Sequence, residues 1–206
     1  MAKRKAQAPP TVRLLQPADY RRMKWKNGKG ETLEIAVDDH DPFRWRVSKA
    51  AMPESAHFSL YTGYDRQIMF LGEGRVHLHG GDIDREVQPE EVVSFSGDVE
   101  LAADIESENE DFNVFTLRGA TRSTLHVAEY RGIEEVQLPF QGNEHFLHAF
   151  AGEIEYLEPN TDTRGIIPAG STLWVTRPKE VNLLNLRTKA KTRSARAAWA
   201  IVSQTN

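Results

Sequence analysis

The sequence predicts an all-β fold, a sandwich or barrel made of short strands. Apolar and polar residues alternate with period two, for example in residues 32–37 and 43–48, which gives a strand one apolar and one polar face. Glycine, proline, asparagine and aspartate interrupt these runs at intervals of about 8 to 12 residues, as in sandwiches and barrels. Residues 70–74 and 149–154 share a layout, an apolar strand turning through a Gly-Glu step. That repeat indicates internal duplication.

The alternation places most of the chain in strands. A short helix is expected from Pro17 to Met23, because proline is favoured in the first turn of a helix. Residues 1–12 are basic and lack a periodic apolar face, so they are expected to be a disordered N-terminus. A first lobe is expected at residues 13–120 and a second at 121–206. The expected strands are residues 33–37, 43–48, 67–71, 75–79, 91–96, 99–105, 112–118, 124–130, 146–150, 153–157, 171–176, 181–187 and 197–203.

The composition excludes several classes of protein. The 206 residues contain no cysteine, which excludes disulfides, thiolate metal sites and a cysteine nucleophile. No run approaches the roughly 20 apolar residues of a membrane helix, and the basic start has no apolar segment after it. A cytoplasmic location without membrane association is therefore expected. The net charge of −4 is unevenly distributed, with nine Lys or Arg against one acid in residues 1–30.

One segment carries a resemblance to a known family. Residues 25–36, Trp-Lys-Asn-Gly-Lys-Gly-Glu-Thr-Leu-Glu-Ile-Ala, resemble the opening signature of the HutD/Ves family. Further blocks follow in the family's order at residues 43–48, 58–59, 63–66, 95–98, 111–113 and 118–119. The resemblance implies a bicupin, two cupin-like jelly-roll β-barrels in one chain, associated with histidine utilisation. Lys29 stands where the family usually has glycine, and its role is left open.

The candidate ligand-binding residues combine arginines, small polar side chains and a glycine turn. Arginine presents a planar fork that can hold a carboxylate through two parallel bonds, and glycines let backbone amides approach a ligand. The alternatives are a bare glycine turn and arginines that only pair with Asp65, Asp98 or Asp111. The candidates are Trp25, Asn27, Gly28, Gly30, Thr32, Glu34, Arg46, Ser48, Arg66, Asp98, Asn113 and Arg118.

The histidines do not match a cupin metal site, so no metal or other cofactor is expected. His77 and His79 lie on one side of an expected strand and could share an ion. The positions of the cupin ligand set, counted from Gly72 and Pro89, instead hold Phe58, Ser59, Leu60, Tyr61 and Ser94. With Val76 and Leu78 facing inward, His77 and His79 are expected on the solvent side.

Three functions remain open, and the first is preferred. It is a metal-independent binding protein for a small acidic metabolite, for which the family context suggests urocanate, formiminoglutamate or formylglutamate. The second is a metal-independent cupin enzyme with Glu34 or Asp98 as base, although no nucleophile motif is present. The third is a nucleic-acid-binding regulator that uses the basic termini. A homodimer is left open.

The first testable prediction concerns metal content. We expect the purified protein to carry no stoichiometric transition metal, because aromatic, aliphatic and hydroxyl side chains occupy the ligand positions. Elemental analysis after dialysis against chelator measures this. One equivalent of zinc, iron, nickel or manganese would overturn it and bring His77 and His79 back as ligands.

The second prediction concerns the N-terminus. Removing residues 1–10 should leave the melting temperature unchanged, because a charged segment without an apolar face adds nothing to a core. Thermal denaturation of the full and trimmed chains tests this. A decrease of several degrees would mean that the segment docks on a barrel.

Overall fold

The computed structural model describes residues 11–25, 30–131, 136–138, 143–158, 163–176, 184–188 and 194–205. These residues form β-strands joined by turns, with one short 3-10 helix, η1 (Pro17–Asp19), and no α-helix among them. None of the described helices is long and apolar enough to cross a membrane. The all-β prediction is confirmed.

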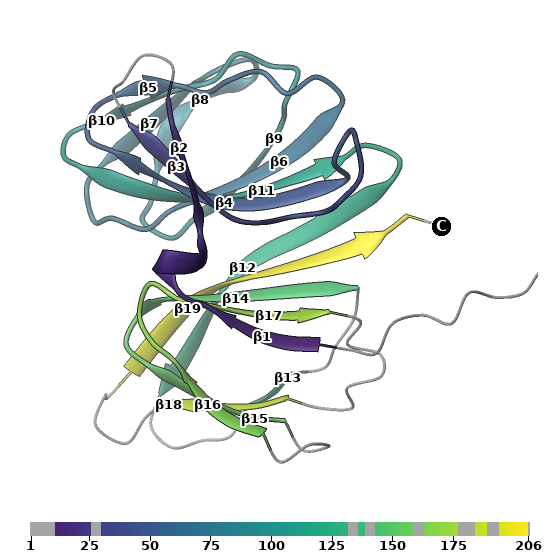
Figure 1. Ribbon diagram of the computed structural model, residues 1–206. Helices are drawn as coiled ribbons and strands as arrows, with labels where there is room; N and C mark the ends of the chain where they lie inside the picture. Colours follow the sequence, from purple (N-terminus) through teal and green to yellow (C-terminus); the bar gives the residue numbers. More distant parts are fainter. Residues whose placement is uncertain are drawn as a thin grey trace, which may run out of the picture.

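Two sheets form the first half of the molecule, the upper part of Figure 1. The larger sheet contains, in spatial order, β2 (Arg21–Lys24), β3 (Glu31–Val37), β4 (Trp45–Met52), β11 (Asn109–Leu117), β6 (Tyr64–Phe70) and β9 (Val92–Ser96). The smaller sheet contains β5 (Ala56–His57), β10 (Ala102–Ile105), β7 (Val76–Gly80) and β8 (Ile83–Val87).

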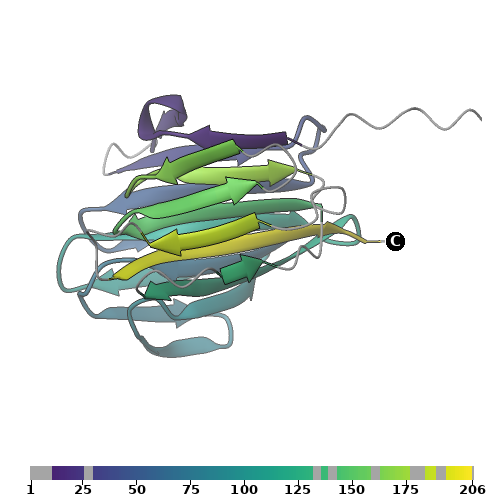
Figure 2. The ribbon, with the colours of Figure 1, turned by 90° about the horizontal axis from the view of Figure 1, so that it is seen from below.

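Two further sheets form the other half, which lies in front of the first half when seen from below in Figure 2. The larger sheet contains, in spatial order, β1 (Thr11–Leu15), β17 (Thr172–Thr176), β14 (Glu144–Ala151), β19 (Ser194–Gln204) and β12 (Thr121–Arg131). The smaller sheet contains β13 (Val136–Leu138), β18 (Leu184–Thr188), β15 (Ile154–Glu158) and β16 (Thr163–Ile167).

The two halves repeat one pattern of strand pairing. The order β4-β11-β6-β9 in the first large sheet corresponds to β12-β19-β14-β17 in the second. The small sheets correspond in the same way, β5-β10-β7-β8 to β13-β18-β15-β16. The turn after β6 and the turn after β14 are the two similar segments of the sequence, so the repeated layout reflects repeated strand connectivity.

The first strand crosses from one half to the other. β1 pairs antiparallel with β17, with Thr11 opposite Thr176 and Leu15 opposite Thr172, and Figure 1 shows it beside β17, away from β2 and β3. Thr11 and Val12 are therefore strand residues, which corrects the expected disordered segment 1–12 at its end. Residues 1–10 lie outside the described residues. The division into lobes at residue 120 stays a prediction.

The expected helix from Pro17 to Met23 is wrong beyond its first turn. Only Pro17–Asp19 is helical, and Arg21–Lys24 forms β2, which pairs with β3 from Arg21 opposite Glu34 to Lys24 opposite Glu31. Pairing with a neighbouring strand satisfies the backbone of residues 21–24, and this tertiary contact overrides the local helix signal.

Three clusters of buried side chains hold the sheets together. One cluster fills the space between the two sheets of the first half, with Ile68, Phe70 and Leu78 among its members. A second fills the other half, around Leu147 and Trp199. The third joins the two large sheets face to face; its members include Trp45, Val47, Phe112, Val114, Phe146, Ala198 and Ala200. Each large sheet is thus covered on both faces.

The structure predicts that two truncated variants differ in melting temperature. Removing residues 1–15 should destabilise the protein by about 3 kcal/mol, because Val12, Leu14 and Leu15 pack against the buried clusters and each contributes roughly 1 kcal/mol when partly buried. The melting temperature should fall by about 6 to 12 °C. Removing residues 1–10 is the matched control. Equal melting temperatures for the two variants would show that β1 does not contribute to stability.

Candidate functional site

The candidate site is a cavity of about 560 Å³ on the inner face of the large sheet of the first half. Its walls come from the β2–β3 hairpin, from strands β4, β6 and β11, and from the segment around β5. The lining residues are Met23, Lys24, Trp25, Thr32, Arg46, Ser48, Ala50, Ala56, His57, Phe58, Ser59, Tyr61, Arg66, Asp111, Asn113 and Phe115.

Two buried arginines flank one aromatic ring across three neighbouring strands. In the sheet register Phe115 of β11 lies opposite both Arg46 of β4 and Arg66 of β6. The guanidinium carbons lie 4.2 Å and 4.4 Å from the centre of the Phe115 ring. These are short cation–π distances. Arg46 is 9% exposed and Arg66 is 4% exposed, so both charges are largely removed from water.

The hydrogen bonds of the two guanidinium groups leave donors unused. Arg66 donates to the carbonyl of Ser59 at 3.2 Å and to Oδ1 of Asn113 at 3.0 Å. Arg46 donates to the Tyr61 hydroxyl at 3.1 Å. The buried Nε of each arginine has no acceptor among the described residues. Burial lowers the pKa of Arg66 to about 10, which still leaves the group charged at neutral pH.

A buried carboxyl group completes the polar part of the cavity. Asn113 donates from Nδ2 to Oδ1 of Asp111 at 2.6 Å, so the Asn113 amide links Arg66 to Asp111. Burial raises the pKa of Asp111 to about 7, although the hydrogen bond from Asn113 and the charge of Arg66 act in the opposite direction. The cavity therefore holds two buried positive charges, with Lys24 as a third and exposed one, against one carboxyl group that is partly protonated at neutral pH.

Six of the candidate residues from the sequence line this cavity: Trp25, Thr32, Arg46, Ser48, Arg66 and Asn113. The Trp25 indole donates to the Thr32 hydroxyl at 3.0 Å. Gly30 lies directly against Trp25, because a Cβ built there would come within 2.9 Å of the indole ring. Asn27 and Gly28 fall outside the described residues.

Besides Gly30, three candidates do not line the cavity: Glu34, Asp98 and Arg118. Glu34 is paired with Arg21 at 3.1 Å. Arg118 lies just beyond β11 and pairs with Asp65 and Asp98, both at 3.0 Å, which is the structural alternative that the sequence left open. These ion pairs hold Asp98 and Arg118 in an exposed cluster. Arg118 follows β11 at an even-numbered position, whereas the side chains of β11 that line the cavity are at odd-numbered positions.

Residues missed at the sequence level include Asp111, Phe115 and Tyr61. Asp111, Asn113 and Phe115 stand two residues apart on β11, so their side chains share one face of the sheet. The spacing of two is present in the sequence, but of these three residues the sequence predicts only Asn113 as a ligand-binding residue. Tyr61 and Ser59 were considered as metal-ligand positions, and both line the cavity with Phe58.

The histidines of β7 face away from the core, as predicted. Val76 and Leu78 are buried, whereas His77 pairs with Asp84 at 2.8 Å and His79 with Asp104 at 3.2 Å at the surface. Among the described residues, the group that could gather three metal ligands is Asp38, Asp39 and His40. It is not part of the cavity described above.

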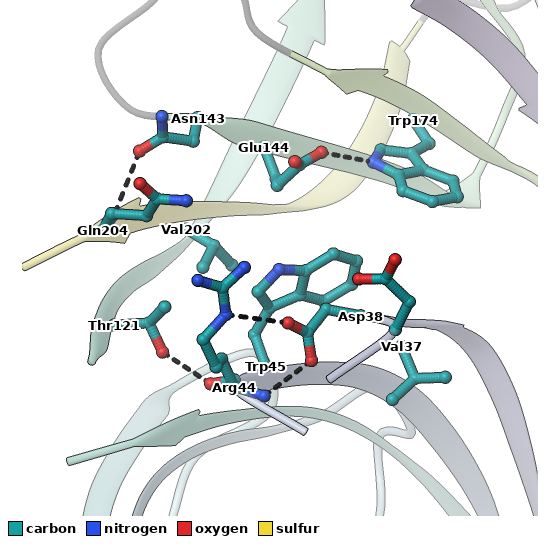
Figure 3. Close-up of a pocket in the computed structure, with 11 residues that line it drawn as sticks. Val37, Asp38, Arg44, Trp45, Thr121, Asn143, Glu144, Trp174, Val202 and Gln204 are labelled. Atoms are coloured by element: carbon teal, nitrogen blue, oxygen red, sulfur yellow. Dashed lines mark hydrogen bonds and ion pairs between the residues drawn. The ribbon is translucent and has the colours of Figure 1, made fainter. Parts of the chain in front are cut away.

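A second cavity, of about 270 Å³, opens between the two halves. Figure 3 shows Asp38 and Arg44 on one side of it and Glu144 and Trp174 on the other. Its charged groups already have partners. The backbone N–H and Nε of Arg44 donate to the two Asp38 oxygens at 2.6 and 3.0 Å, and the Trp174 indole donates to Glu144 at 2.8 Å. The cavity of the first half, with its two buried arginines, is the stronger candidate.

Comparisons with known proteins agree with this architecture. The chain is 41% identical over 95 residues to an uncharacterised 21.2 kDa protein in the hutC 3′ region of Pseudomonas putida, which covers 44% of this chain and 50% of that protein. It is 31% identical over 109 residues to protein Ves of Cronobacter sakazakii, covering 51% and 60%. The chain thus spans about half the length of the curated relatives it matches.

Solved structures extend the likeness over nearly the whole chain. HutD from Pseudomonas fluorescens SBW25, determined in a formate condition, matches with 25% identity and a TM-score of 0.74, covering 95% of this chain and all of that one. A cupin 2 conserved barrel domain protein from Leptotrichia buccalis matches with 10% identity and a TM-score of 0.55, covering 88% and 92%. The second likeness concerns the fold alone and is of cupin type.

A family model described as HutD matches residues 17–196. This range includes the opening signature, both large sheets apart from β1 and most of β19, and every residue of the cavity lining. The chain therefore belongs to the HutD family.

Proposed function

We propose that the protein binds a small carboxylic acid in the cavity of its first half, without a metal. The observation that carries this proposal is the pair of buried guanidinium groups on either side of Phe115. A buried donor without an acceptor costs about 1–3 kcal/mol, and the two Nε groups lack acceptors among the described residues. A carboxylate would add negative charge and acceptors where both are in deficit.

The aromatic lining defines what else the ligand would contact. The Phe58 ring lies 5.3 Å from the Arg66 guanidinium carbon, and the Tyr61 ring lies 4.9 Å from that of Arg46. Ser48 and Asn113 add polar groups to the same face of the sheet. A ligand with a carboxylate, a short planar or aliphatic body and an amide-like group fits this arrangement.

The names of the relatives support a link between this family and histidine utilisation, and we propose that the ligand belongs to that process. One is encoded beside hutC, and one similar structure is that of HutD itself. We therefore take urocanate, formiminoglutamate and formylglutamate as the ligands to test. Each carries a carboxylate and a nitrogen-containing group.

An enzymatic role is the second candidate, and one observation favours it. Asp111 is a buried carboxyl group with a pKa raised to about 7, which suits a general acid or base. It replaces Glu34 and Asp98 as the candidate base, since neither of those lines the cavity. Product analysis after incubation of the three acids with the protein separates turnover from binding.

The fourth testable prediction compares two arginine variants. Arg66→Ala should bind the preferred acid roughly ten- to a hundredfold more weakly, because one charged hydrogen bond contributes about 1.5 to 3 kcal/mol. Arg118→Ala is the matched control and should bind like wild type, because Arg118 lies in the exposed cluster with Asp65 and Asp98. Calorimetric titration with the three acids measures the affinities.

Circular dichroism must show that both variants are folded. Equal affinity of Arg66→Ala and wild type would remove Arg66 from the site. An absence of binding of every acid to the wild type would reject the proposed function as a whole. The Trp25 indole, which lines the cavity, supplies a fluorescence signal as an independent measure of binding.

A further inference from the structure

Asp111 is the acidic residue that lines the arginine cavity, and its surroundings keep it apart from bulk water. It is 2% exposed and lies on β11 opposite Ala50 of β4 and Phe70 of β6. Its carboxyl group accepts hydrogen bonds from the Asn113 side chain and from the backbone of Ala50. Its contact with Arg66 is indirect, since Asn113 accepts a hydrogen bond from Arg66 and donates one to Asp111.

In this arrangement the negative charge of an ionised Asp111 disfavours the binding of an anion in the same cavity. An ionised Asp111 adds a negative charge beside the two guanidinium groups, in an interior where water screens charges poorly. A second anion in the same cavity would repel it. Protonation of Asp111 removes this repulsion and leaves both arginines to the ligand.

We infer that the cavity binds an acid together with one proton, and that Asp111 is the residue that takes up this proton. The inference rests on the proposed function and specifies it further. The ligand arrives as a carboxylate, Asp111 gains a proton from solvent, and no bond of the ligand is broken. The neutral carboxyl group then offers a hydrogen-bond donor where the ionised one could only accept.

The pKa of Asp111 in the free protein places its uptake of a proton near physiological pH. Burial raises it to about 7, and the charge of a bound anion would raise it further. Between these two values the complex holds more protons than the free protein does. The affinity for an anion is therefore highest below the lower value and declines as the pH rises toward the higher one.

The effect of pH on Asp111 must be distinguished from its effect on other charged groups nearby. Arg66 stays charged across this range, because its pKa, lowered by burial to about 10, still lies above it. Glu110, its neighbour on β11, has its side chain on the opposite face of the sheet, where it pairs with Lys49 at 2.7 Å. Histidine is the side-chain type that ordinarily titrates in this window, so His57 needs its own variant. The remaining titratable residues of the lining are Lys24 and Tyr61.

The test uses formate as the probe, because it is the smallest carboxylate and stays ionised throughout the range. Dissociation constants are measured by NMR titration of the full chain between about pH 5.5 and 8.5. Wild type should bind formate about tenfold more weakly at the upper end than at the lower, as expected for a shift of one pKa unit. Asp111→Asn mimics the neutral carboxyl group and should bind tightly at every pH.

Two variants serve as controls. Asp84→Asn makes the same change of charge at an exposed residue of β8 that pairs with His77, and His57→Gln removes the histidine of the lining. Both should keep the pH dependence of wild type. A wild-type affinity that does not change with pH, or a dependence that survives in Asp111→Asn or disappears in His57→Gln, would overturn the inference while leaving the binding proposal in place.

A direct measurement covers the case in which Asp111→Asn fails to fold. Carbon-13 labelling of the aspartate carboxyl groups of wild type follows the titration of Asp111 with and without saturating formate. An upward shift of its pKa on binding supports the inference, and an unchanged pKa overturns it. If formate and the three larger acids all fail to bind wild type at any pH, the proposed function itself is rejected, and the inference with it.

Discussion

Two arginine side chains lie side by side on the inner face of a β-sheet, and the rest of the cavity accommodates their charge. Burying a charged group without compensation is expensive. The protein offsets part of this cost with aromatic rings, since Phe115 lies close to both guanidinium groups and Phe95 lies near Arg66. Asn113 accepts a hydrogen bond from Arg66 and in turn donates one to Asp111. The compensation is incomplete, because the buried Nε of each arginine has no acceptor among the described residues.

The sheet that carries the arginines has a different partner on each face. Arg46 and Ser48 point into the cavity, whereas Trp45 and Val47 between them belong to the cluster that joins the two large sheets. Side chains alternate along a strand, so the same strand serves the site and the contact between the halves. The second half thus acts as a support that fixes β4 and β11, and through them Arg46 and Asp111, at their positions in the sheet.

The lining of the cavity includes Phe58, Ser59 and Tyr61, which stand at the positions where the sequence predicts the metal ligands of a cupin. Positive charge in this cavity is supplied by arginines, which are anchored by the strands themselves. A guanidinium group binds a carboxylate through directed hydrogen bonds, so the orientation of the ligand would follow from the fixed direction of Arg46 and Arg66.

The sequence by itself determined the all-β class, the repeated layout, the HutD resemblance, and the arginine, asparagine, serine and tryptophan side chains of the site. These are properties of local alternation and of short motifs. Only the tertiary structure decided which charged residues come together. Arg118 and Arg66 look alike in the sequence, but Arg118 lies past the end of β11 and pairs at the surface, whereas Arg66 sits opposite Phe115. Strand pairing likewise places Asp111 in the cavity and β1 beside β17 in the second half. The register of such pairs depends on strands that are distant in the sequence, so it is not a local property of the chain.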